Sequence, residues 1–292
     1  TVRVQGRETI EPAYEGHFDL ITSNIPFGDV SLFDPAFSNS RDPVRRQGAW
    51  AIHNYFFMKS VDLVRDGGLV AFITSQGMAD SERNKPVREW LMERCDLVAA
   101  VRLPNNLFTD HAGTEVGSDL IVLQKNSAAR PLSERQRDFI ETRTLSNGIT
   151  VNNSFQSLDR VVQTSAKVGT NPYGKPAMEF THAGGVEGIA RALADMLAED
   201  MERHFNRELA RLMKQLLPGV SVSSYTARHT WATLAYHSGV PVGLISQSLG
   251  HSSIRVTMTY LKPFDAEVID RINRQVISLV KKSKKKKDGR FN

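Results

Sequence analysis

Short apolar runs alternate with helical patterns over the first half of the chain. Four such runs predict strands, at residues 18–23, 69–73, 97–101 and 120–123. Apolar residues at helical spacing predict one helix from about 49 to 64, which stops before Gly67-Gly68, and another from 84 to 94. Strands separated by helices of this length indicate an α/β fold with a parallel sheet. The fourth strand follows the third without a long helix, so it is the strand that can run antiparallel.

The pattern changes twice further along the chain. Asn, Gly, Ser, Thr and Pro dominate residues 145–185, which predicts an irregular linker. After it, apolar residues recur at helical spacing and predict only helices: 186–217 as one or two, then about 224–237, 241–250, 254–261 and 266–280. Ser223 or Ser224 can cap the helix that ends at His237, and Gly239 is a suitable stop. We expect Trp231, Leu234, Leu244, Ile245 and Leu249 to bury one another.

The predicted organisation is therefore an α/β fragment at 1–144, a linker at 145–185, a helical connection at 186–217, a helical segment at 218–280 and a tail at 281–292. The helix at 266–280, with Val268, Ile272 and Val276 on one face, is a candidate surface for self-association.

Composition restricts the environment of the protein. The 292 residues are 40% hydrophobic, enough for a buried core, but no run of 18 apolar residues predicts a membrane span. Cys95 is the only cysteine, which excludes a disulfide within the chain and favours a reducing cytoplasm. We expect Cys95 to be a small core residue. The N-terminus has no initiator Met and no signal-peptide core, so we expect a chain processed or cut from a longer one.

The positive charge is concentrated at the C-terminus. The net charge is +5, yet residues 281–292 alone carry +6 and the other 280 residues sum to −1. A lysine-rich tail of this kind is expected to be disordered and suits the phosphate backbone of DNA. A solubilising end without a partner is the alternative.

Three motifs in the helical segment stand at informative spacings. Arg228 lies in the sequence Ser224-Tyr-Thr-Ala-Arg-His-Thr-Trp. His251, in Leu249-Gly250-His251, stands 23 positions after Arg228, and Tyr260 stands nine positions after His251. Each residue alone is more often a packing or capping residue than a catalytic one. Together, over about 222–271, they resemble the active-site half of the tyrosine recombinase (phage integrase) family.

This resemblance implies phosphoryl transfer on DNA without a metal. Tyr260 would attack a scissile phosphate and form a phosphotyrosine intermediate. Arg228 would hold two phosphate oxygens with its planar fork, and His251 would donate a hydrogen bond to the same phosphate. Tyr225 stands where the family often has His, and its phenol can still donate a hydrogen bond. The family's first catalytic Arg and its Lys have no counterpart before Tyr225, so the catalytic set is incomplete.

A second motif follows the first predicted strand. Asn24, Ile25, Pro26 and Phe27 resemble the catalytic tetrapeptide of N6-adenine DNA methyltransferases, with Ile25 where that family prefers Pro. The resemblance implies that the Asn24 side chain and the Ile25-Pro26 backbone hold the target amino group, while Phe27 stacks on the flipped base. An ordinary strand-to-loop turn is the alternative.

Two further segments extend this second resemblance. Residues 102–108 (Arg-Leu-Pro-Asn-Asn-Leu-Phe) and 113–125, which begin Gly-Thr-Glu-Val, are similar to the large methylases of bacterial mobile elements, and the likeness covers about 2–204. The family's glycine-rich turn and ribose-binding acid, which hold S-adenosylmethionine, precede the tetrapeptide. We find neither, so we expect no bound cofactor.

The sequence therefore predicts a chimera: part of a Rossmann-like methyltransferase sheet joined to part of a recombinase domain, with the junction near 201–214. The leading hypothesis is site-specific DNA recombination by an incomplete active site. Adenine methylation and non-enzymatic DNA binding are the alternatives. Affinity for S-adenosylmethionine would distinguish methylation from the other two, and a covalent DNA adduct would distinguish recombination.

Overall fold

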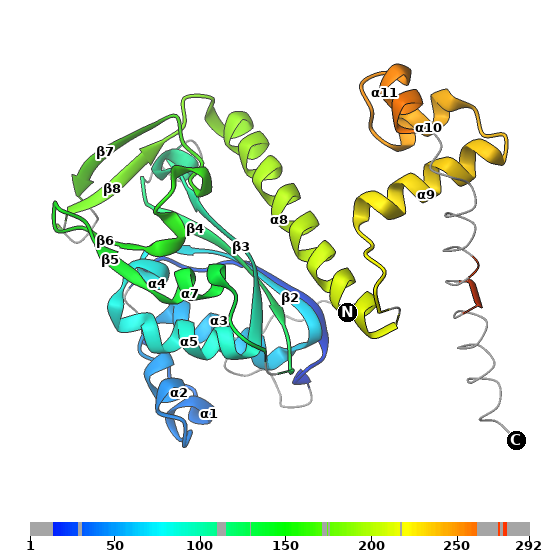
Figure 1. The fold of residues 1–292 in the computed structure, drawn as a ribbon. Helices are drawn as coiled ribbons and strands as arrows, with labels where there is room; N and C mark the ends of the chain where they lie inside the picture. Colours follow the sequence, from blue (N-terminus) through cyan, green and yellow to red (C-terminus); the bar gives the residue numbers. More distant parts are fainter. Residues whose placement is uncertain are drawn as a thin grey trace, which may run out of the picture. The chain divides into compact units, whose positions relative to one another are not determined.

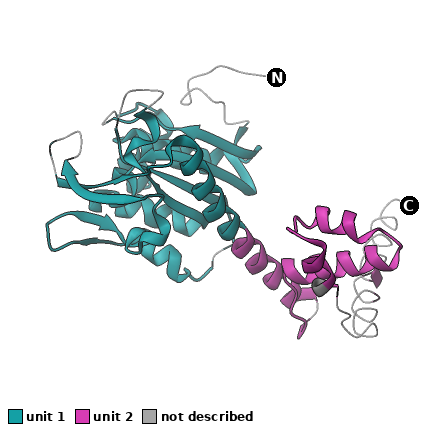
Figure 2. Cartoon of the chain, turned by 90° about the horizontal axis from the view of Figure 1, so that it is seen from above, with its two compact units in different colours: residues 1–201 teal, residues 202–292 magenta. Residues whose placement is uncertain are grey.

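The computed structural model describes residues 14–28, 31–109, 115–128, 130–170, 174, 176–216, 218–261, 274 and 277–278. The chain forms two compact units, residues 1–201 and 202–292, and each is described by itself (Figure 2). Nearly all of the helix predicted at 266–280, with its candidate self-association face, lies outside the described residues, and so does the whole basic tail. Among the described residues, no helix combines the length and apolarity needed to cross a membrane.

Unit 1 is built on a four-stranded sheet of order β1-β2-β4-β3 (Figure 1). Its strands are β1 (Phe18–Asn24), β2 (Val64–Ser75), β3 (Cys95–Leu103) and β4 (Ser118–Lys125). β1 and β2 are parallel, whereas β4 is antiparallel to both β2 and β3. The antiparallel fourth strand is thus confirmed, and the sheet is mixed. The reason is that the β3–β4 connection contains no crossover helix, so β4 returns directly beside β3.

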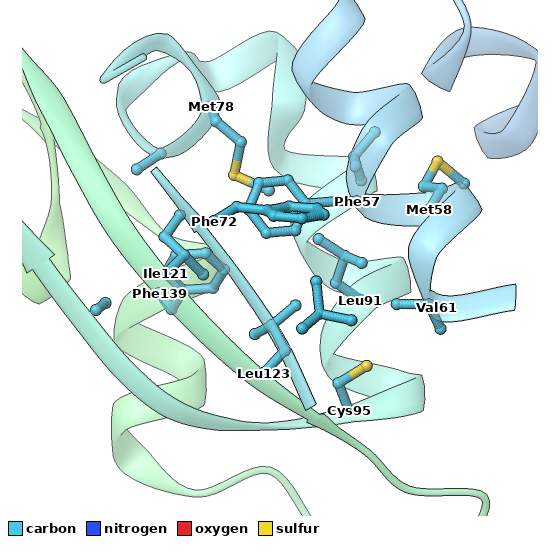
Figure 3. Packing of buried hydrophobic residues seen from close by; sticks show 14 of the residues in the cluster. Phe57, Met58, Val61, Phe72, Met78, Leu91, Cys95, Ile121, Leu123 and Phe139 are labelled. Atoms are coloured by element: carbon cyan, nitrogen blue, oxygen red, sulfur yellow. The ribbon is translucent and has the colours of Figure 1, made fainter. Parts of the chain in front are cut away.

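Helices cover both faces of this sheet (Figure 1). α3 (Ile52–Leu63), α5 (Lys85–Arg94) and α7 (Glu134–Ile140) lie on one face, and the first turns of α8 (Gly185–Leu216) lie on the other. Figure 3 shows the larger core, in which α3 and α5 pack against alternate residues of β2 and β4: Phe57, Met58, Val61, Phe72, Leu91, Ile121 and Leu123. Cys95 lies in this core, 3% exposed, as predicted.

Short elements complete unit 1. They are α1 (Pro35–Ser38), α2 (Pro43–Gly48), α4 (Gly77–Asp80) and the 3-10 helices η3 (Glu82–Asn84), η4 (Asn105–Phe108), η5 (Asn153–Phe155) and η6 (Leu158–Arg160).

The structure differs from the expected irregular linker at 145–185. Two antiparallel hairpins form here, β5 (Thr142–Thr144) with β6 (Thr150–Asn152) and β7 (Ser165–Thr170) with β8 (Pro176–Thr181). The segment is anchored by a few isolated apolar residues, Phe155, Val161, Val162 and Phe180, all buried. Most of them lie outside the hairpin strands, where only Val151 of β6 and Phe180 of β8 are buried apolar residues, so the sequence shows no long strand period here.

Unit 2 contains the rest of α8 together with α9 (Ser224–His237), α10 (Val242–Ser248) and α11 (Ile254–Tyr260). The predicted cap is present, since the Ser223 hydroxyl accepts from the Thr226 N–H at 3.2 Å. The core of this unit is small: Ala232, Ile245 and Leu249 are buried, with Ala235 and Leu261 packed against them.

The predicted burial of Trp231, Leu234 and Leu244 is therefore wrong, because these side chains are 48%, 48% and 55% exposed. Ala232 and Ala235, three residues apart, form the face of α9 that packs in this cluster. Trp231 and Leu234 consequently lie on a neighbouring face of the helix.

Candidate functional sites at the sheet edge and the Leu-Gly-His turn

The tetrapeptide at 24–27 lies where β1 ends. Asn24 is the exposed last residue of the strand, opposite Ile73 of β2. The Ile25 side chain is buried, and its N–H donates to the Ile73 carbonyl at 2.9 Å. A proline has no N–H to donate, so Ile25 adds one sheet hydrogen bond that a Pro-Pro sequence would lack. This bond is what Ile25 contributes at the position where the methyltransferase pattern has Pro, and it holds the backbone next to Asn24 at the carboxyl edge of the sheet.

Phe27 faces a second aromatic side chain that the sequence did not single out as functional. Its ring lies 5.8 Å from the Phe108 ring, centroid to centroid, at an interplanar angle of 63°. Phe27 is 37% exposed and Phe108 is partly exposed. The signal was present in the sequence, because Phe108 ends the methyltransferase-like segment 102–108. Only the fold brings it beside Phe27.

The segment that carries Phe108 is held by two asparagines. The Asn105 carboxamide oxygen accepts from the Phe180 N–H at 3.0 Å. Asn106 makes a paired contact with the backbone of His182, accepting from its N–H and donating to its carbonyl, each at 3.1 Å. The Asn105 carbonyl also accepts from the Val116 N–H at 3.2 Å, which joins the two methyltransferase-like segments. Phe108 is thus positioned by β8, by His182 directly after it, and by the segment just before β4.

A buried ion cluster supports the same region. Arg102, 1% exposed, donates twice to Asp119 (2.9 and 3.1 Å) and once to Asp80 (2.9 Å). Its guanidinium also lies 4.1 Å from the centre of the Phe155 ring. Burial lowers the pKa of Arg102, but the two carboxylates outweigh burial and raise it above its usual value. Arg102 is a permanent charge that joins the ends of β3 and β4, and this is a positioning role.

The described residues do not fit S-adenosylmethionine. Within them, β1 pairs with β2 alone, and no glycine-rich turn with a neighbouring acid follows a strand at the carboxyl edge. No step through this cofactor is therefore derived for them.

In unit 2, the Leu-Gly-His sequence forms the end of α10. Gly250 has φ of +67°, and its N–H donates to the Gln247 carbonyl at 3.0 Å. The His251 N–H donates to the Ser246 carbonyl, also at 3.0 Å. These two bonds with a left-handed glycine define a Schellman cap, which fixes His251 two residues beyond the helix cap. Gly250 is therefore required by the backbone.

Arg228 reaches the same turn from α9. Its guanidinium donates to the Leu249 carbonyl at 2.5 Å, two residues before His251. Nδ1 of His251 lies 2.9 Å from the Thr257 hydroxyl of α11. The turn thus gathers two of the three residues that the sequence predicts at the phosphate.

Tyr225 and Tyr260 complete the predicted set. Tyr225 lies three residues before Arg228 on α9, is 56% exposed, and its ring is 4.3 Å from that of His229. Burial lowers the pKa of His229. Tyr260 ends α11, but its side chain lies outside the described residues.

Comparison with protein families gives one match for each part of the chain. The family described as N-6 DNA Methylase matches residues 5–190, more than half of the chain. The family described as Phage integrase matches residues 198–267. The two matches meet between 190 and 198, ahead of the junction predicted at 201–214. A tyrosine recombinase of Pseudothermotoga lettingae is 38% identical over 53 residues, which cover 18% of each chain.

Several solved structures are similar to parts of the chain. A protein described as a class I S-adenosylmethionine-dependent methyltransferase, from Listeria monocytogenes, has a TM-score of 0.31 and 19% identity, covering 40% of this chain and 34% of that one. The type I restriction enzyme EcoKI M protein has a TM-score of 0.29 and 14% identity, covering 68% of this chain and 52% of that one. The type IIG restriction endonuclease BpuSI has a TM-score of 0.33 and 15% identity, covering 73% of this chain and 24% of that one. The chain spans under a fifth of the curated relative and about half or less of each of these structures.

Proposed function

The chain belongs to the N-6 DNA methylase family, and we propose that unit 1 holds an unpaired adenine of DNA at the Phe27–Phe108 pair. Its methylase domain is followed by a phage integrase domain, so it is a DNA-acting protein. The observation that carries the proposal is the pairing of two partly exposed aromatic rings beside Asn24 at one sheet edge.

Each group has a role that its chemistry allows. The exposed Asn24 carboxamide can accept a hydrogen bond from the adenine amino group. Phe27 and Phe108 meet edge to face, so the rings have to move apart for a base to stack between them. Asn105 and Asn106 hold the Phe108 segment to β8, so we expect Phe27 to move more. S-adenosylmethionine supplies the methyl group in this family, and the described residues bind and orient the base only.

The experiment compares two DNA duplexes, one with a single unpaired adenine and one with a single unpaired thymine. We expect fluorescence anisotropy to show tighter binding of the adenine duplex. Asn24→Ala should remove this preference, and Phe108→Ala should weaken binding of both duplexes about tenfold. Leu158→Ala, at an exposed apolar residue outside the site, is the matched control. Equal affinity of the unmodified protein for the two duplexes would contradict the proposal.

A second function is supported by unit 2. We propose that Tyr260 acts on a DNA phosphate within an incomplete recombinase site. The phenol of Tyr260 would lose its proton as its oxygen forms a bond to phosphorus, the bond to the leaving 5′ oxygen would break, and that oxygen would take up a proton, so the proton count balances. The observation in favour is the Arg228–Leu249 hydrogen bond, which brings Arg228 to the His251 turn. DNA binding without either activity is the remaining alternative, and it predicts neither adenine preference nor a covalent adduct.

A further inference from the structure

Two aromatic side chains of unit 1 have no role in the proposed function. Phe33 is 78% exposed and Trp50 is 70% exposed, the highest values among the aromatic residues that the structure describes. Their segments are adjacent, since the Leu32 N–H donates to the Ala49 carbonyl at 2.9 Å. Exposing two large rings on neighbouring segments is unfavourable in water unless a ligand covers them.

The two segments lie at the same sheet edge as the Phe27–Phe108 pair. Trp50 precedes α3, whose first turn includes His53. The Nε2 atom of His53 lies 3.2 Å from the side-chain nitrogen of Asn84. That nitrogen donates at 2.8 Å to the carbonyl of Gly77, two residues after the end of β2. Because β1 and β2 are parallel, the end of β2 and the end of β1 share one edge. Trp50 therefore lies near the carboxyl edge of the sheet, where β1 ends at Asn24.

Three exposed arginines lie on the segments that lead to Trp50 or contact them. Arg41 and Arg46 lie just before and within α2, which ends two residues before Trp50, and Arg83 lies in η3, which α2 contacts. Arg46 donates to the Arg41 carbonyl at 3.2 Å, and Gln47 donates to the Arg83 carbonyl at 3.0 Å. The Trp50 N–H in turn donates to the Gln47 carbonyl at 3.0 Å. Within the described part of the chain, Arg41, Arg46 and Arg83 form no ion pair.

The nearby acids leave this positive charge largely uncompensated. Asp34 binds Tyr55 and Lys59, Asp42 binds Trp90, and Asp62 binds Arg45. Counted over the described residues of these segments, three exposed arginines stand against one exposed carboxylate, that of Glu82 beside Arg83. Exposed rings on segments that also carry arginines without acidic partners fit a strand that offers base faces and phosphates together.

The geometry points to Phe33 and Trp50 as a stacking surface for bases of an unpaired DNA strand, with Arg41, Arg46 and Arg83 on its phosphates. This inference rests on the proposed function for the identity of the ligand, DNA. It adds the strand that flanks the held base, and it does not depend on adenine at Asn24. Base stacking on aromatic rings tolerates any sequence, because every base has a π face.

Tryptophan emission tests this directly in the whole protein. The chain has three tryptophans; Trp90 is 6% exposed, so Trp231→Phe leaves Trp50 as the exposed emitter. Saturation with single-stranded oligothymidine should quench Trp50, whereas a duplex of equal length should not. Oligothymidine also separates this site from the adenine-selective one, since loss of adenine preference alone would leave the quenching intact. Phe33→Ala should weaken the oligothymidine complex about tenfold, and Phe205→Ala, at an exposed ring of unit 2, should not.

Charge and competing occupants need separate measurements. Replacing the three arginines by Gln should make the slope of log affinity for oligothymidine against log salt concentration shallower by about 2, if each arginine contacts one phosphate.

Three results would overturn the inference. One is unchanged Trp50 emission when anisotropy shows that the strand is bound. Another is equal quenching by heparin, which has charge without bases. The third is weak quenching of Trp50 emission by acrylamide that becomes stronger when the protein is diluted, which would show that a second copy of the chain covers the rings.

Discussion

The guanidinium of Arg228 donates a hydrogen bond to the carbonyl oxygen of Leu249 at 2.5 Å. Leu249 is the cap residue of α10, and the left-handed Gly250 and His251 follow it in the Schellman cap. The bond satisfies a carbonyl at the end of a helix and joins α9 to the turn that carries His251. Arg228 therefore has a structural partner in unit 2 in addition to any phosphate that it binds.

The backbone of this turn makes opposite predictions for two nearby glycines. Gly250→Ala should destabilise unit 2 by about 1–2 kcal/mol, because a Cβ strains a residue at φ of +67°. Gly243→Ala should stabilise α10 by up to about 1 kcal/mol, since Gly243 is within the helix and a Cβ there meets open space. Amide hydrogen exchange of residues 242–250 measures both effects. Equal protection in the two variants would show that the cap does not fix the turn.

The single cysteine should be chemically silent in the folded protein. Burial raises the pKa of Cys95 to about 12, and the side chain is 3% exposed in the core of unit 1. Almost no thiolate is then available at pH 8, so Ellman's reagent should react only as unit 1 unfolds. A urea series should give the same midpoint for thiol reactivity as for circular dichroism of the sheet. Stoichiometric reaction without urea would mean that this core opens.

Asp34 predicts how the stability of unit 1 depends on pH. Burial raises its pKa, but hydrogen bonds from Tyr55 and the Ala36 N–H, together with Lys59, outweigh burial and leave it below the ordinary 3.8. A carboxyl whose pKa is lowered by folding stabilises the fold above its unfolded pKa, and this is lost as pH falls through the folded value. Asp34→Asn should therefore cost about 1–3 kcal/mol at pH 7 and progressively less below pH 3.8. A pH-independent difference between the two proteins would assign the effect to packing.

The fold could be predicted where the hydrophobic period was strong. The α/β pattern and the long helices α3, α5, α8 and α9 follow from apolar residues at regular spacing, and the antiparallel fourth strand follows from the missing helix between it and the third. The two hairpins within 142–181 could not be predicted, because their strands hold only two buried apolar residues, Val151 and Phe180. Burial of Trp231 was predicted from apolarity alone, whereas the small Ala232 makes the actual contact.

Some residues of the candidate sites could likewise be predicted from the sequence, and others could not. The motif spacing predicts Arg228 and His251 as site residues; the Schellman cap fixes the backbone at His251, and Arg228 bonds the Leu249 carbonyl two residues before it. Phe108 could not be paired with Phe27 from the sequence, because they are 81 residues apart and meet only through the sheet and η4. The sequence also gave no sign that Arg102 would be buried between two carboxylates.

For the 292-residue chain alone, we predict no useful affinity for S-adenosylmethionine. Its described residues offer neither a glycine-rich turn nor a ribose-facing acid at the carboxyl edge. Isothermal titration calorimetry should show no binding heat at micromolar concentrations. Micromolar binding would mean that residues outside the described set complete a cofactor site, and base binding at Phe27–Phe108 would then lead to methyl transfer.

The most demanding prediction concerns Tyr260. The sequence contains the Arg228, His251 and Tyr260 positions of the recombinase pattern, but no counterpart of the family's first Arg and Lys before Tyr225. Losing one donor to the developing oxyanion costs about 3–4 kcal/mol, roughly 10²–10³ in rate. Losing the Lys that protonates the leaving oxygen costs about another 10²–10⁴. Little or no covalent adduct should therefore form on a nicked suicide substrate.

Denaturing electrophoresis after incubation with that substrate measures the adduct, and matched variants identify its source. Any weak band should disappear in Tyr260→Phe and persist in Tyr236→Phe, which alters an exposed phenol of α9 outside the matched set. Arg228→Lys keeps the charge but loses the planar fork, so it should also remove the band. A strong band that depends on Tyr260 would show that other residues supply the missing groups. In that case the site is complete, and strand breakage and rejoining becomes the principal activity of the chain.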